Sequence, residues 1–219
     1  MKYLTVFITL LLLSCNSTKI VDKPIIFDDE RNQLTLEYLL DRYGLEQETP
    51  TISPKMIVLH WTAIPTLEKS FDAFNNATLP NWRPDIKSVS GLNVSSQFLI
   101  DQDGIIYRLM PETTMARHVI GLNHCAIGVE NVGGTDETPL TKKQVEANIW
   151  LVEYLANKYD IDYLIGHYEY TYFEGHELWL EKDEGYRTQK TDPGEEFLST
   201  VKEATKHLKF KKTPAKNTH

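Results

Sequence analysis

Cysteine is scarce in this chain of 219 residues, where only Cys15 and Cys125 occur. Two cysteines cannot build a small fold held together by a disulfide framework, and no disulfide is expected. Cys125 stands directly before the apolar segment 126–129. Because free cysteine is most often simply part of the core, we expect Cys125 to be a small buried thiol rather than a nucleophile.

Positive charge is also in short supply. The chain has 23 Lys and Arg against 31 Asp and Glu, which gives a formal net charge of -8 and a pI near 5.4. No stripe of basic residues is available to neutralise phosphates, so nucleic acid is excluded as an expected partner. The exception is the end of the chain, where residues 209–219 are expected to form a short basic, solvated tail.

The apolar run at the N-terminus, residues 3–13, is too short for a membrane-spanning helix, which needs about 20 residues. With Lys2 before it, the run is typical of a secretory signal peptide over residues 1–14. The run ends in Leu12-Leu13-Ser14-Cys15, which resembles the bacterial lipobox and implies a lipid on Cys15. The alternative is an ordinary cleaved signal with an incidental cysteine.

A lipidated Cys15 predicts a protein of the bacterial cell envelope, anchored in a membrane and facing the periplasm or located at the outer membrane. A second acyl chain makes such anchoring stable. Residues 15–34 are then expected to form the lipidated N-terminus and a polar tether.

Residues 35–208 are expected to fold as one domain, since the chain is 41% hydrophobic and shows no internal repeat or low-complexity segment. Apolar periodicity predicts helices and strands that alternate along the chain. Thr141 and Gln144 form a capping box at the start of the clearest helix. This order predicts an α/β (α+β) fold with a mixed central sheet flanked by helices. The predicted helices are 35–43, 66–74, 141–159 and 195–208, and the predicted strands are 56–59, 96–100, 105–109, 126–132 and 163–165.

Three metal-ligating side chains stand at the ends of predicted elements. His60 follows the apolar strand 56–59, His167 follows the strand 163–165, and Asp192 precedes the last helix. Two imidazoles and one carboxylate brought together make a zinc site with one open position, the arrangement that hydrolases use.

Several further segments carry a resemblance to a known family. The sequence resembles the zinc-dependent N-acetylmuramoyl-L-alanine amidases of type 2, which share their fold with phage amidase lysozymes and peptidoglycan recognition proteins. The resemblance runs from about Met56 to about Phe197. Its landmarks, in chain order, are Val58-Leu59-His60-Trp61-Thr62, Ser95–Ile100 with Asp103-Gly104, Gly121-Leu122-Asn123, Ile127-Gly128-Val129-Glu130, Gly166-His167 and Lys190-Thr191-Asp192-Pro193-Gly194.

The resemblance implies roles for individual residues. His60, His167 and Asp192 map to the ligands of Zn²⁺, Glu130 to a catalytic acid/base, and Lys190 to a cation beside the metal. A carboxylate beside the metal can take a proton from water and pass it to the leaving amine, and a cation can stabilise the oxyanion. The residues assigned to substrate binding are His118, Asn123, Trp61 and Gln97.

The sequence also departs from the family pattern. Relatives often have histidine where Gln97 stands, and some phage relatives use a tyrosine where Ser96 stands. In many relatives a few residues separate the second histidine from the lysine, whereas 22 residues lie between His167 and Lys190. The aromatic side chains of this insertion either pack it onto the domain, the favoured interpretation, or form a wall against the substrate.

The resulting hypothesis is a zinc hydrolase that cleaves the amide bond between N-acetylmuramic acid and L-alanine, with peptidoglycan or muropeptides as substrate. One alternative is a non-catalytic module that binds or senses peptidoglycan, but such relatives tend to lose a ligand and all three are present here. The other is a zinc endopeptidase that cuts the stem peptide with the same centre. Nothing in the sequence predicts an oligomeric state.

Overall fold

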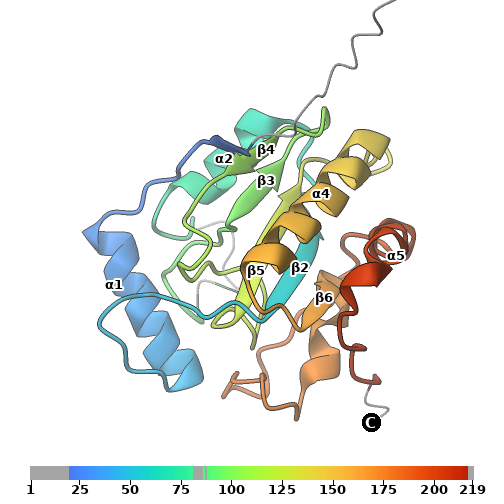
Figure 1. Cartoon of the computed structure of the whole chain (residues 1–219). Helices are drawn as coiled ribbons and strands as arrows, with labels where there is room; N and C mark the ends of the chain where they lie inside the picture. The colour runs from blue at the N-terminus through green and yellow to red at the C-terminus, as the bar shows by residue number, and fades with distance from the viewer. Residues whose placement is uncertain (1–19, 81–85, 87, 217–219) are drawn as a thin grey trace, which may run out of the picture.

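The computed structural model describes residues 20–80, 86 and 88–216. A six-stranded sheet in the order β1-β4-β3-β5-β2-β6 forms its centre (Figure 1). Only β3 and β4 pair antiparallel, and the other neighbours run parallel. The expected mixed sheet is therefore confirmed. The strands are β1 (Ile20–Asp22), β2 (Met56–Trp61), β3 (Phe98–Ile100), β4 (Ile106–Arg108), β5 (Ala126–Asn131) and β6 (Tyr163–Gly166).

Helices cover the sheet, and each of the predicted helices is present with somewhat different bounds. The capping box predicted at the start of α4 is confirmed: Thr141 Oγ1 accepts from the Gln144 backbone N–H, and the Gln144 side chain accepts from the Thr141 N–H. The helices are α1 (Asp29–Tyr38), α2 (Leu67–Asn75), α4 (Lys142–Lys158) and α5 (Glu195–Ala204), with a π-helix at Leu39–Tyr43 and 3-10 helices at His167–Phe173 and Lys206–Leu208.

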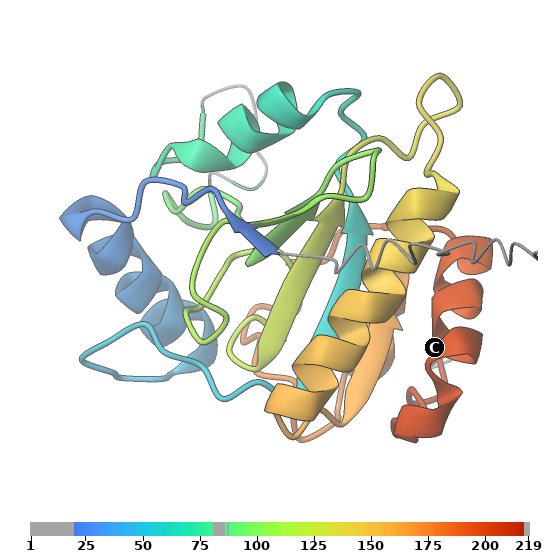
Figure 2. The ribbon, with the colours of Figure 1, turned by 45° about the horizontal axis from the view of Figure 1, so that its top comes forward.

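Strand β2 lies between β5 and β6, and both of its faces are buried. One face, with Ile57 and Leu59, packs in a cluster with α4 and α5, which lie side by side (Figure 2). The opposite face, with Met56 and Val58, packs against the segment 119–122 and the 3-10 helix after β6. Because successive side chains of a strand alternate between faces, the next two residues of β2 leave the sheet on opposite sides.

The expected tether is wrong for residues 20–34, because this segment is part of the folded domain. Strand β1 pairs with β4, and α1 begins at Asp29 instead of residue 35. A polar residue of this segment, Arg31, fixes it to the domain. Its buried guanidinium donates to the backbone carbonyls of Phe74 (2.8 Å) and Asn75 (3.2 Å) at the end of α2. These carbonyls are the orphan acceptors that every helix C-terminus leaves.

The start of the basic tail also differs from the expectation. Phe210 packs against the core, and the Lys211 N–H donates to the Asp162 carbonyl at 2.7 Å. The solvated tail is predicted from charge and from the usual behaviour of chain ends, and neither carries information about such contacts.

The signal peptide and Cys15 lie outside the described residues, where they stay predictions. Within the described part of the chain, every helix is too short or too polar to cross a membrane.

Candidate metal centre

Three side chains from distant parts of the sequence meet at the carboxyl ends of β2 and β6. His60 Nδ1 lies 2.9 Å from His167 Nδ1 and 3.1 Å from Asp192 Oδ2, and His167 Nδ1 lies 2.9 Å from the same oxygen. All three residues are buried, with exposed fractions of 1%, 7% and 7%. The alternation of β2 places His60 on the face of Met56 and Val58, opposite α4 and α5.

This donor set fits a zinc ion. Zinc in hydrolases is held by imidazole nitrogens and a carboxylate oxygen at about 2.0–2.2 Å, so its ligand atoms must cluster within a few ångström of each other. Burial and the neighbouring His60 lower the pKa of His167 to about 4, which keeps this imidazole neutral at pH 7. Burial would raise the pKa of Asp192, but the two histidines outweigh it and hold the pKa well below its ordinary value. A neutral imidazole and an ionised carboxylate are the forms that ligate a metal.

A third histidine orients His60. His60 Nε2 lies 3.0 Å from His118 Nδ1, and His118 Nε2 lies 3.3 Å from the Ala126 carbonyl oxygen. A carbonyl only accepts, so His118 carries its proton on Nε2 and accepts from His60 through Nδ1. His60 then has its proton on Nε2, which leaves a lone pair on the Nδ1 that faces His167.

His167 and Asp192 line a cleft of about 380 Å³. Glu130 on β5 lines it, directly opposite His60 in the parallel register. Lys190 lines the same cleft from the segment that leads to Asp192. A carboxylate, a cation and a metal-ligating cluster around one hollow are the parts that amide hydrolysis needs.

The family model described as N-acetylmuramoyl-L-alanine amidase matches residues 47–195. The chain belongs to this family. This amidase cleaves the amide bond between N-acetylmuramic acid and L-alanine of peptidoglycan.

Solved structures share the fold of the amidase. The N-acetylmuramoyl-L-alanine amidase LysC from Clostridium intestinale URNW is 23% identical with a TM-score of 0.54, and the match covers 89% of this chain and 100% of that one. The endolysin N-acetylmuramoyl-L-alanine amidase LysCS from the same organism is 21% identical with a TM-score of 0.53 and the same coverage. No curated protein sequence matches significantly.

The structure brings some of the predicted substrate contacts of the amidase to the cleft and not others. Trp61 and His118 line it. Asn123 lines a smaller hollow that shares His118, His167 and Lys190 with this cleft, and its Oδ1 accepts from the backbone N–H groups of His118 and Val119, both at 2.8 Å. Gln97 is fully buried among backbone groups: its Nε2 donates to the Thr114 carbonyl and its Oε1 accepts from the Gly128 N–H.

Gln97 is therefore a structural residue, and its assignment to substrate binding is wrong. It lies just before β3, where its amide accepts from one backbone N–H and donates to one backbone carbonyl.

The insertion between His167 and Lys190 packs onto the domain, which is the interpretation that the sequence favours. Phe173 is fully buried, and the ring of Trp179 lies so close to Gly121 that a Cβ there would approach it to 2.6 Å. Gly121 also has a φ of +80°, a conformation that favours glycine. Trp179 in turn stacks on Tyr170, and the Arg187 guanidinium lies over the Trp179 ring, 4.7 Å from its centroid.

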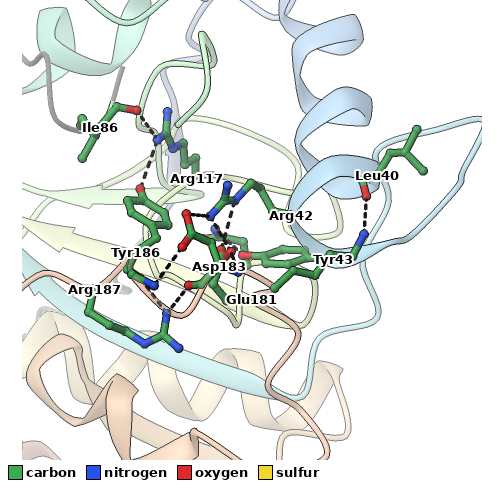
Figure 3. A network of polar contacts seen from close by, with 12 residues as sticks. Leu40, Arg42, Tyr43, Ile86, Arg117, Glu181, Asp183, Tyr186 and Arg187 are labelled. Carbon is green, nitrogen blue, oxygen red and sulfur yellow. Dashed lines mark hydrogen bonds and ion pairs between the residues drawn. The ribbon is translucent and has the colours of Figure 1, made fainter. Parts of the chain in front are cut away.

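Polar contacts fasten the far end of the insertion to the body of the amidase (Figure 3). Arg42 donates to Glu181 at 2.6 Å and to Asp183 at 3.3 Å. The buried Arg117 donates to the Ile86 carbonyl at 2.9 Å and to the Tyr186 hydroxyl at 3.2 Å.

Arg117 also lines the cleft, and sequence reasoning missed it. Its position directly before His118, in the apolar segment 115–122, is the signal that could have identified it, since a lone arginine among apolar residues needs buried partners.

Proposed function

We propose that this amidase is zinc-dependent, with His60, His167 and Asp192 as the ligands, and that a lipid on Cys15 anchors it in the bacterial cell envelope. The convergence of two Nδ1 atoms and one carboxylate oxygen within 3.1 Å, at the head of a cleft, carries the zinc assignment. A bound Zn²⁺ would supply a strong nucleophile at neutral pH and polarise the scissile carbonyl.

Glu130 is the proposed general base. From its place on β5 opposite His60, its carboxylate takes a proton from the attacking water and delivers it to the amine of L-alanine as that group leaves. Lys190 places a cation in the cleft, where it stabilises the oxygen on which negative charge develops. His118 keeps the His60 ring in the tautomer whose Nδ1 lone pair points at the centre.

The lipobox pattern before Cys15 supports the anchor. Peptidoglycan lies in the envelope, so an enzyme held on a membrane that faces it stays near its substrate. Because residues 20–34 pack on the domain, the proposed link from lipid to fold is shorter than the sequence suggested.

The zinc proposal is tested with the full-length chain, purified in detergent and incubated with muropeptides. Mass spectrometry follows the products with and without a chelator, and again after zinc is added back. Free stem peptide that begins with L-alanine, lost with the chelator and restored by zinc, is the expected result. Cleavage within the stem peptide would instead identify an endopeptidase, and binding without cleavage would identify a recognition module.

The anchor is tested separately, by growth of cells that express the chain with radiolabelled palmitate. The wild-type chain is expected to take up the label and to sediment with membranes. A Cys15→Ala variant is expected to lose the label and to leave the membrane fraction, and labelling that survives this change would remove the proposed anchor.

A further inference from the structure

A second hollow, of about 780 Å³, lies on the other side of β2 from the metal-ligating face. The first turns of α4 and α5 and the loop 134–139 line it. These two helices lie side by side on the same face of the sheet (Figure 2). We call this hollow the α4–α5 groove. Its volume falls within the range of about 300–1,000 Å³ that is typical of ligand pockets.

Trp61 joins the groove to the metal cleft, because it lines both hollows. It is the residue after His60, so it leaves β2 on the side of α4 and α5. Two glycines hold its ring: a Cβ on Gly134 would overlap the indole, and a Cβ on Gly194 would lie 3.5 Å from it. Trp61 is nevertheless only partly buried, so a fixed aromatic surface remains at the junction of the two hollows.

The two hollows differ in charge: the cleft is lined by as many cations as carboxylates, whereas the groove is acidic. The cleft is lined by the cations Arg117 and Lys190 in addition to Glu130 and Asp192. The α4–α5 groove contains one cation, Lys142, together with several carboxylates and hydroxyls. These acceptor-rich residues are Asp136, Glu146, Glu195, Glu196, Thr135 and Thr200.

The substrate of this family has two chemically different parts on either side of the scissile amide. The stem peptide carries carboxylates, which the cations of the cleft attract and the acids of the groove repel. The glycan strand offers hydroxyl donors, and ionised carboxylates accept from hydroxyls in short, strong hydrogen bonds. The apolar face of a sugar ring also packs well on a fixed aromatic ring.

We propose that the α4–α5 groove binds the glycan strand of peptidoglycan, so that the strand crosses the end of β2 over Trp61 while the stem peptide occupies the metal cleft. This inference rests on the proposed function, because it takes the amide at the metal centre as the point where the two parts of the substrate meet. It makes the amidase an enzyme of glycan strands several sugars long, for which a single N-acetylmuramic acid with its peptide is a poor substrate.

The test compares two synthetic substrates with the same stem peptide, cleaved by the full-length zinc-loaded chain in detergent. One is N-acetylmuramoyl-peptide, and the other carries the peptide on an internal N-acetylmuramic acid of a tetrasaccharide. The wild type is expected to cleave the tetrasaccharide with a kcat/KM at least about tenfold higher, equivalent to about 1.4 kcal/mol. Equal kcat/KM values for the two substrates would overturn the proposal.

A variant locates the preference in the groove. Glu195→Ala with Glu196→Ala removes two exposed carboxylates that line it, and Glu203→Ala removes an exposed carboxylate of the same helix outside it. The double variant is expected to lose most of the tetrasaccharide preference while its rate on N-acetylmuramoyl-peptide and its zinc content stay unchanged. The Glu203→Ala control keeps the preference. A double variant that still prefers the tetrasaccharide would remove the groove from glycan binding.

A binding experiment separates this proposal from the proposed function. Calorimetry with a tetrasaccharide that carries no peptide measures the groove alone. If neither peptide substrate is cleaved, the proposed function fails, but tetrasaccharide binding by the wild type and its loss in the double variant still support the groove. No tetrasaccharide binding by the wild type would overturn the proposal.

Discussion

Two of the polar clusters in the described part of the chain are built on opposite principles. In the cluster that fastens the insertion, the carboxylates of Glu181 and Asp183 meet the guanidinium of Arg42 (Figure 3). In the metal centre, two ring nitrogens and a carboxylate oxygen face one another at 2.9–3.1 Å.

The difference distinguishes a cluster that stabilises the fold from a cluster that can bind a ligand. Glu181, whose side chain has no exposed surface, is compensated by a cation that the chain itself supplies. Converging lone pairs repel unless a cation from outside joins them, and such a site is built for a ligand at some cost to the stability of the apo form. Burial does not distinguish the two clusters. They differ in the groups that meet: a cation with carboxylates in the first, and acceptor atoms with one another in the second.

The largest expected effect comes from removal of a ligand. Asp192→Ala is expected to bind zinc far more weakly and to lose at least about a thousandfold in kcat/KM, since Asp192 is the carboxylate that meets His60 and His167 among the described residues. Zinc content by mass spectrometry and turnover of muropeptides check this. Full activity in a variant free of zinc would break the distinction between the clusters.

Glu130→Gln separates catalysis from zinc binding within the cleft. The amide keeps the shape of the side chain but cannot take a proton, so kcat is expected to fall about 10²–10⁴-fold while zinc content stays the same. Steady-state kinetics and metal analysis of the same preparation measure both quantities. Activity like that of the wild type would remove Glu130 from the chemistry.

The His118→Phe substitution tests how far the metal centre depends on its surroundings. The hydrogen bond to His60 Nε2 is lost, so the ring is no longer held in one tautomer, and the zinc Kd is expected to rise about 10–100-fold. Competition with a chelator dye measures the Kd without any reliance on activity. An unchanged Kd would mean that packing alone orients His60.

The smallest expected effect on catalysis comes from the paired cluster. Glu181→Gln leaves Arg42 with one carboxylate partner and is expected to lower the free energy of unfolding by about 3 kcal/mol, because a buried ion pair is broken. The kcat and zinc content of the folded protein are expected to stay within about twofold of wild type, since Arg42 and Glu181 are not among the residues that line the cleft or form the metal-ligating group. Urea unfolding and kinetics at low temperature check both. A loss of zinc in this variant would show that the two clusters are coupled.

Much of the fold was predictable, because it follows from local rules. The capping box at Thr141 and Gln144 and the apolar strand 56–59 are patterns of neighbouring residues, and both are confirmed. The role of Gln97 was not predictable in this way. Its partners, Thr114 and Gly128, are 17 and 31 residues away in sequence, and nothing local signals that a glutamine will satisfy them.

Some features of the candidate site are likewise local in sequence, and others depend on the tertiary structure. That His60 and His167 stand at the carboxyl ends of buried strands is a local feature, and the resemblance of the sequence to a known family suggests that they meet Asp192. The contact of His118 with His60 depends on how the segment 115–125 folds over β2 and β5.

By itself, the sequence determined the alternation along β2, and with it that His60 and Trp61 leave the strand on opposite faces, because the period of two is a property of any extended chain. Only the tertiary structure decided what each face meets. His60 meets His167, Asp192 and His118, while Trp61 meets a groove between two helices that begin 53 residues apart, at Lys142 and Glu195. Such meetings depend on long-range packing, which selects partners by shape and charge across the whole chain and leaves no mark in the residues next to them.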